Sequence, residues 1–97
     1  MRAILTPTSV VVRSGGLIES EVDKEIVALN IESGTCYGLN GVGSVIWKLL
    51  ATPVRVEEIC TKLVAEYQVD RDVCERDVMD LLEELRAEKL VTVTTAP

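Results

Sequence analysis

The chain has 97 residues, of which 47% are hydrophobic and 27% charged, the composition of one ordinary globular domain. Ten Lys and Arg stand against sixteen Asp and Glu, which gives a net charge of −6, and histidine is absent. The acidity argues against binding to a phosphate backbone, and the lack of histidine excludes Cys–His nucleophiles and His-ligated metals. Aromatic residues make up only 3%, which argues against a base-stacking platform.

The first half of the chain has the pattern of β-strands. We predict strands at residues 9–13, 25–30 and 35–39, because each is a short run rich in β-branched or aromatic residues and bounded by turn signals. Residues 31–35, with Gly34 suited to a left-handed position, predict a hairpin between the second and third strands. Together the three strands predict a small antiparallel meander. Alternation along the strands predicts a core face made of Val27, Leu29, Tyr37 and Leu39.

The second half has a helical pattern in three segments, at about residues 40–51, 56–67 and 71–89. Asn40 and Asp70 are the predicted N-caps of the first and third helices. Trp47 lies beside the apolar stripe of the first helix and is expected to close the core. The predicted buried stripes are Val42, Val45, Ile46, Leu49 and Leu50; Val56, Ile59, Cys60, Leu63, Val64 and Tyr67; and Val73, Cys74, Val78, Leu81, Leu82 and Leu85.

The order of these elements predicts an α+β fold with strands and helices segregated along the chain. It resembles a winged helix-turn-helix, with a three-stranded antiparallel sheet followed by three helices. Residues 90–95 alternate and are β-prone, so they form either a further short strand or a loose end. We expect one domain over residues 1–97, with its core at about 9–91 and flexible ends.

The cysteines and the N-terminal sequence predict a cellular compartment. The three cysteines are odd in number and form no CxxC pair, and no apolar run is long enough for a signal peptide or a membrane span. We therefore expect a cytoplasmic protein with reduced thiols. Cys60 and Cys74 fall at apolar helix positions and are expected to be buried, whereas Cys36 alternates with Tyr37 and is expected to be an exposed, inert strand residue.

The acidic side chains, which could act as catalytic groups or metal ligands, show no pattern typical of an active site. Asp77, Asp80, Glu83 and Glu84 crowd the third predicted helix, but carboxylates on one helix lack convergent metal ligands, and basic residues lie among them. A solvated face explains them better than a catalytic pair or a metal site. We therefore predict no enzyme activity, no catalytic residue, no metal and no cofactor.

A winged helix also raises the possibility of DNA binding. Residues 54–90 hold six basic and eleven acidic residues, so the acidity is concentrated where a DNA-recognition helix would need Lys and Arg. We therefore expect no nucleic-acid partner and no membrane partner. Strong retention on DNA with a steep salt dependence would contradict this prediction.

The third predicted strand suggests a different partner. Residues 35–39 contain no Pro or Lys that would block pairing, so an extended peptide could add to this edge as a further strand. The alternative is that a terminal segment of the chain covers the edge. If the edge lies beside the third helix, the two elements would form a groove.

Several blocks of this sequence resemble the PqqD family. Members typically read E-x-V-x-L, then G-x-x-Y-x-L-N-x-x-G-x-x-I-W-x-L-L, with two further helix motifs. The corresponding segments are EIVALN at residues 25–30, SGTCYGLN at 33–40, GSVIWKLL at 43–50, VEEI at 56–59 and DVMDLLEEL at 77–85. The similarity covers about residues 9–91.

This resemblance implies a peptide-recognition domain of pathways that modify ribosomally made peptides. Such domains bind the leader of a precursor peptide as an added strand, in a groove shared with the third helix, and have no catalytic activity of their own. The context of Tyr37 and Trp47 looks most like the free-standing recognition proteins of lasso-peptide clusters. Their partners are the precursor leader, a cysteine protease that removes it, and a cyclase.

The sequence departs from the family pattern at two places. The pyrroloquinoline-quinone branch usually has a Y-P-E-G segment before its L-N, where this chain has residues 33–38, SGTCYG, which argues against that pathway. Members also often have Gly where this chain has Lys89. Because a left-handed non-Gly residue costs about 1 kcal/mol, we expect the third helix to end differently here.

The resemblance and helical spacing together select the candidate peptide-binding residues. They are Thr35, Cys36, Tyr37, Gly38 and Leu39 on the strand and Val73, Arg76, Asp77, Asp80, Leu81 and Glu84 on the helix. The carboxylates are expected to meet Lys or Arg of the leader, and Trp47 either belongs to the core or lines a partner surface. Two alternatives remain: a PqqD-like carrier with a radical SAM partner, and an adaptor that docks on an enzyme without binding a leader.

Overall fold

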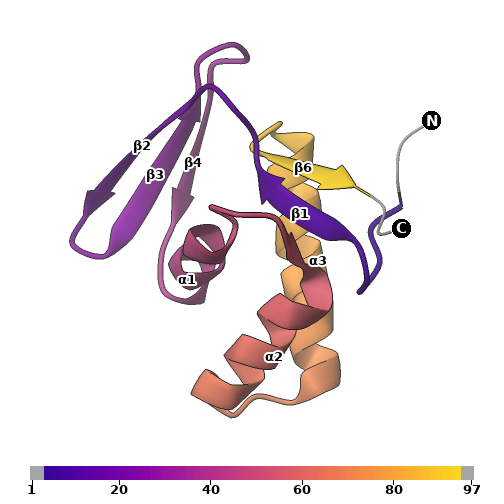
Figure 1. The fold of residues 1–97 in the computed structure, drawn as a ribbon. Coiled ribbons are helices and arrows are strands. Elements are labelled where there is room, and N and C mark those ends of the chain that lie inside the picture. Colours follow the sequence, from indigo (N-terminus) through magenta and orange to yellow (C-terminus); the bar gives the residue numbers. More distant parts are fainter. Residues whose placement is uncertain (1–3, 95–97) are drawn as a thin grey trace.

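The computed structural model describes residues 4–94, which form three helices and two three-stranded antiparallel sheets (Figure 1). One sheet has the strand order β2-β3-β4 and stands to one side of the helices; we call it the wing. The other has the order β5-β1-β6 and, with the helices, makes up the body. The strands are β1 Val10–Arg13, β2 Leu17–Val22, β3 Glu25–Asn30, β4 Thr35–Leu39, β5 Val54–Arg55 and β6 Val91–Thr94.

The split into two sheets corrects the predicted single sheet. Residues 9–13 were expected to pair in the meander, but β1 pairs with β5 on one side and β6 on the other. The place beside β3 is taken by β2, a strand that the sequence pattern did not predict. No residue of β2 is fully buried, and so it lacks the apolar alternation of a strand with one core face. Residues 91–94 do form a strand, and Thr95 lies outside the described residues.

The β2–β3 turn sets the register of the wing. Asp23 and Lys24 have φ angles of 51° and 68°, as in the two-residue type I′ turn that joins antiparallel strands. In this register Ile26 and Ala28 are buried opposite Leu39 and Tyr37. The predicted core face of β3 was therefore wrong, since Val27 is 41% exposed. Both faces of EIVALN carry apolar residues, and only the packing of the wing selects one of them.

The helices are α1 Val42–Leu49, α2 Val56–Tyr67 and α3 Arg71–Ala87. Asp70 caps α3 as predicted, because its carboxylate accepts from the backbone N–H groups of Asp72 and Val73. The N-cap of α1 is Gly41 rather than Asn40, and no side chain caps it. Among residues 4–94, no helix is long and apolar enough to cross a membrane.

The core lies where the three helices meet both sheets. Trp47 is completely buried, as are Leu50, Ile59, Leu82 and Leu85. Cys60 and Cys74 are buried and Cys36 is exposed, as predicted, and all three thiols are free. Three predicted stripe positions proved wrong, because they are more than 40% exposed: Val42, Tyr67 and Val73.

The end of α3 uses a left-handed residue even though no glycine is present. Lys89 has a φ angle of 60°, its N–H donates to the carbonyl of Arg86, and the N–H of Leu90 donates to the carbonyl of Leu85. These two bonds form a Schellman motif, and the buried Leu85 and Leu90 supply its apolar contact. The expectation that the helix ends differently was wrong, because Lys89 adopts the left-handed conformation that a glycine would have there. The two hydrogen bonds of the motif, which pair two otherwise unpaired carbonyls, offset the cost of that conformation.

Replacing Lys89 by glycine is expected to stabilise the fold by about 1 kcal/mol, because glycine adopts the left-handed conformation without steric strain. Urea unfolding followed by circular dichroism measures the change. Lys62→Gly is the matched control, since Lys62 lies inside α2, where glycine is expected to destabilise by about 1 kcal/mol. A lower free energy of unfolding for Lys89→Gly would contradict the strain argument.

Candidate functional site

The edge of β4 presents unpaired backbone groups. The type I′ turn makes Val22 and Glu25 a hydrogen-bonded pair, so Glu25, Val27 and Leu29 direct their backbone groups to β2. Ile26, Ala28 and Asn30 then direct theirs to β4, which agrees with the bond from Gly34 N–H to the Asn30 carbonyl at 2.8 Å.

On β4 the same alternation divides the strand. Thr35, Tyr37 and Leu39 pair with β3, whereas the N–H and C=O groups of Cys36 and Gly38 point away from the sheet. β4 is the last strand of its sheet. Two donors and two acceptors on this edge are thus directed toward any segment that lies alongside it.

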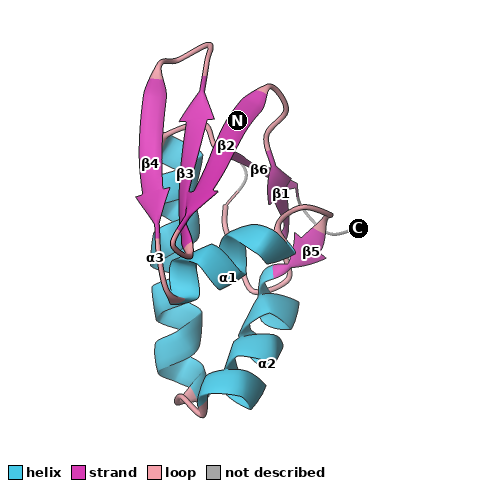
Figure 2. Ribbon diagram, turned by 90° about the vertical axis from the view of Figure 1, so that its left-hand side faces the viewer, coloured by secondary structure: helices cyan, strands magenta, loops and turns pink. Residues whose placement is uncertain are grey.

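In the view of Figure 2, helix α3 passes behind the β4 side of the wing and continues below it, and a side-chain hydrogen bond connects the two elements. The Tyr37 hydroxyl on β4 donates to the Glu84 carboxylate on α3 at 2.7 Å. This hydrogen bond, partial burial and the negative charges of Glu84 and Glu88 raise the pKa of Tyr37 to about 12. The phenol therefore stays protonated, and continues to donate, up to strongly alkaline pH.

The predicted α3 residues lie mainly on one face of the helix. Val73, Asp77, Asp80, Leu81 and Glu84 recur at helical spacing on the side that Glu84 turns toward β4. Arg76 lies at the flank of this face, farther from the core. We call the β4 edge and this α3 face the candidate surface. Leu39 was also predicted to belong to it, but its side chain is buried and its backbone pairs with β3.

An apolar pocket of about 370 Å³ adjoins the candidate surface near the start of α3. Its lining comes from all three helices and the connection between α2 and α3, and includes Val42, Tyr67, Val69, Val73, Asp77 and Leu81. Four of these, Val42, Tyr67, Val69 and Val73, are among the large apolar side chains that are more than 40% exposed. The sequence patterns missed the pocket, because they assigned Val42 and Tyr67 to the core.

The candidate surface is acidic. Asp77, Asp80 and Glu84 are exposed, and none of the ion pairs found in residues 4–94 involves them. Glu83, by contrast, pairs with Arg86 at 3.2 Å on the same helix. An apolar pocket that Asp77 lines, with Asp80 and Glu84 farther along the same helix face, suits a partner that carries both apolar and basic side chains. Trp47 does not contribute to any such surface, because it is completely buried.

Comparisons with known proteins give consistent results. The family model described as "Coenzyme PQQ synthesis protein D (PqqD)" matches residues 25–91, which run from β3 to the first residue of β6. A solved structure described as "TbiB1 in Complex with the TbiA(beta) Leader Peptide" is 41% identical, with a TM-score of 0.77. The match covers 82% of this chain and 93% of that one.

A second structure, "Lasso peptide synthetase B1 complexed with the leader peptide", is 23% identical and has a TM-score of 0.75, so it supports the fold alone. This match covers 84% of the present chain and 96% of the other. Among curated proteins, none matches this sequence.

Proposed function

This chain belongs to the PqqD family, and on that premise we propose that it binds the leader region of a ribosomally synthesised precursor peptide. The leader adds to β4 as a further strand and is presented to a leader protease or modifying enzyme. The observation that carries the proposal is the free edge of β4, with the backbone groups of Cys36 and Gly38 directed outward beside α3. The 41% identical TbiB1 structure, described as a complex with a leader peptide, supports it.

Three kinds of contact would hold the leader. Main-chain hydrogen bonds to Cys36 and Gly38 give affinity that depends little on sequence. The apolar pocket takes a large apolar side chain. The carboxylates of Asp77, Asp80 and Glu84 attract Lys or Arg of the leader and set its register, and Arg76 at the flank attracts an acidic residue.

For the pathway, we propose lasso-peptide biosynthesis in the cytoplasm. The partners would be a cysteine protease that removes the leader and a cyclase, and this chain would supply no catalytic group and no cofactor. The segment SGTCYG at residues 33–38, which replaces the Y-P-E-G of the pyrroloquinoline-quinone branch, supports a pathway other than that one.

Titration with labelled leader peptides tests the proposal. The probes are the TbiA(beta) leader and the leader of any short precursor found encoded beside the gene for this chain, each with a scrambled control. We expect fluorescence anisotropy to rise with saturation in the micromolar range for at least one leader and not for its scrambled control. No rise for either leader at about 50 μM protein, a binding free energy weaker than about −6 kcal/mol, would overturn the function.

A further inference from the structure

The two halves of the candidate surface belong to different parts of the molecule. β4 is in the wing and α3 is in the body. The chain passes between wing and body at residues 14–16 and 40–41, where Gly16 and Gly41 have φ angles of 74° and 52°, conformations that suit glycine. The spacing between β4 and α3 is therefore set by the contacts that hold the wing on the body.

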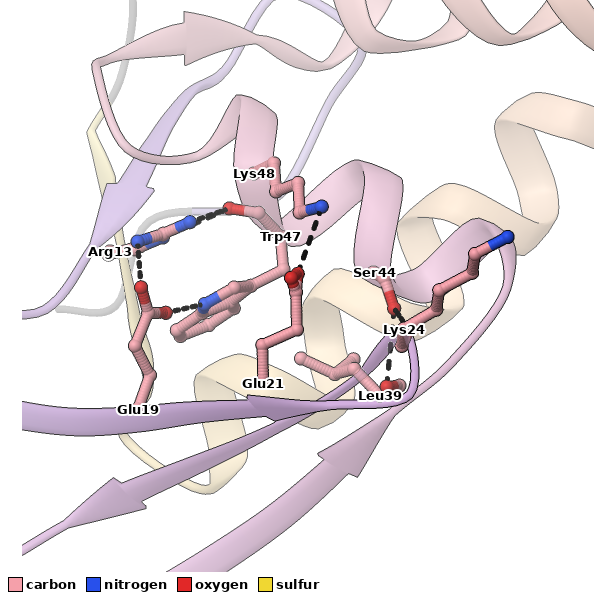
Figure 3. Close-up of polar contacts among 8 residues, drawn as sticks. All are labelled: Arg13, Glu19, Glu21, Lys24, Leu39, Ser44, Trp47 and Lys48. Carbon is pink, nitrogen blue, oxygen red and sulfur yellow. Dashed lines mark hydrogen bonds and ion pairs between the residues drawn. The ribbon is translucent and has the colours of Figure 1, made fainter.

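Near α3, two side-chain bonds connect wing and body. Asn30 donates through Nδ2 to the Lys89 carbonyl at 2.9 Å, and Tyr37 donates to Glu84. At the end of the wing that carries the β2–β3 turn, the Ser44 hydroxyl on α1 contacts the carbonyls of Lys24 and Leu39, each at 3.2 Å (Figure 3). The remaining edge of the wing is β2, which lies on the side opposite β4.

Glu19 ties β2 to the body through both of its carboxylate oxygens (Figure 3). Nη1 of Arg13 donates to Oε1 at 3.2 Å, and the indole N–H of Trp47 donates to Oε2. Arg13 is itself fixed, since its Nε and Nη2 donate to the Trp47 carbonyl at 3.0 and 2.7 Å. Its guanidinium carbon also lies 4.8 Å from the centroid of the indole ring.

This contact differs from its neighbour on the same strand. Glu21 pairs with Lys48 at 3.1 Å. Glu19 and Glu21 are equally exposed, at 46%, but the Lys48 side chain is 61% exposed and that of Arg13 only 22%, and pairs with such an exposed partner contribute little. Trp47 is completely buried, so its N–H would lose the one side-chain acceptor that it has among residues 4–94 if Glu19 were removed. A charge-assisted bond to a buried donor holds position much better than a solvated ion pair.

We propose that Glu19 is a positioning residue for peptide binding. Its carboxylate, held by Arg13 and Trp47, fixes the tilt of the wing and thereby the spacing between β4 and α3. An added strand must lie about 4.8 Å from β4 and still place side chains against α3, so a small movement of the wing would disturb one contact or the other. Glu19 itself lies two strands away from the peptide edge. The proposal rests on the proposed function.

The first test compares the leader affinity of Glu19→Ala, Glu19→Gln and the matched control Glu21→Ala. We expect at least a tenfold loss for Glu19→Ala, a smaller loss for Glu19→Gln, which keeps an acceptor for Trp47, and no more than a twofold loss for Glu21→Ala. Thermal unfolding identifies any variant that fails to fold. If Glu19→Ala is not folded, the leader affinity of Glu19→Gln, compared with that of the wild type, decides the test.

A second readout measures the wing position without any leader. Cys36 is exposed on β4, whereas the other two thiols are buried, so Cys36 and an Ala87→Cys substitution on α3 accept spin labels selectively. We expect Glu19→Ala, or Glu19→Gln in its place, to shift or broaden the distance distribution, and Glu21→Ala to leave it unchanged.

The outcomes separate the two proposals. Wild-type affinity in the folded Glu19 variants, or an unchanged distance distribution, would overturn the positioning role. Failure of the wild-type protein to bind any leader would overturn the proposed function, which this inference requires, and the distance measurement would still show whether Glu19 holds the wing.

Discussion

The Cys36→Pro variant is expected to lose at least about tenfold in leader affinity while keeping its fold, because proline removes a donor that faces outward from β4. The proline ring would also occupy the space that an added strand needs. Backbone pairing between β3 and β4 uses Thr35, Tyr37 and Leu39, so the hydrogen bonds of the wing stay intact. Anisotropy titration and circular dichroism measure the two effects.

The other edge of the wing offers a matched control. In β2 the backbone of Glu21 points away from β3, so Glu21→Pro places the same residue type at an equivalent outward position. We expect this variant to bind the leader with nearly unchanged affinity. Equal losses in the two variants would mean that the leader does not add to β4.

The Val73→Glu variant is expected to weaken leader binding by more than tenfold, because it places a charge in the wall of the apolar pocket. Burying an apolar side chain of the leader there is worth about 1.5–3 kcal/mol, and this gain would be lost. The introduced carboxylate also lies one helical turn from Asp77, where like charges repel. Since Val73 is 42% exposed, the fold should tolerate the change.

Val22→Glu is the control for this substitution. Val22 is 64% exposed at the end of β2 and does not line the pocket, so the same chemical change there should leave affinity within about twofold. Isothermal titration calorimetry of both variants, with thermal unfolding in parallel, measures the difference. Unchanged affinity in a folded Val73→Glu protein would show that the pocket takes no part in binding.

The elements whose signals are local could be read from the amino-acid sequence alone. The limits of α2, the cap at Asp70, the hairpin strands β3 and β4, and the burial of Trp47 could all be predicted, because spacing and capping act within a few residues. The concentration of acidic residues in the helical half was also evident, and it argued against a DNA-recognition helix. The short segments that resemble the PqqD family could also be recognised, because each consists of residues close together in the sequence.

Which elements contact one another depends on tertiary packing, and the sequence patterns did not predict it. The exposed strand β2, rather than β1, pairs with β3 in the wing, and an exposed edge strand has no clear apolar alternation by which it could be predicted. The buried face of β3 carries Ile26 and Ala28, which could not be predicted because both faces of this strand carry apolar residues. The exposure of Val42 and Val73, the pocket between the helices and the attachment of Glu19 to Trp47 all depend on contacts between distant residues. Spacing shows which residues share a face, but only packing determines what that face contacts.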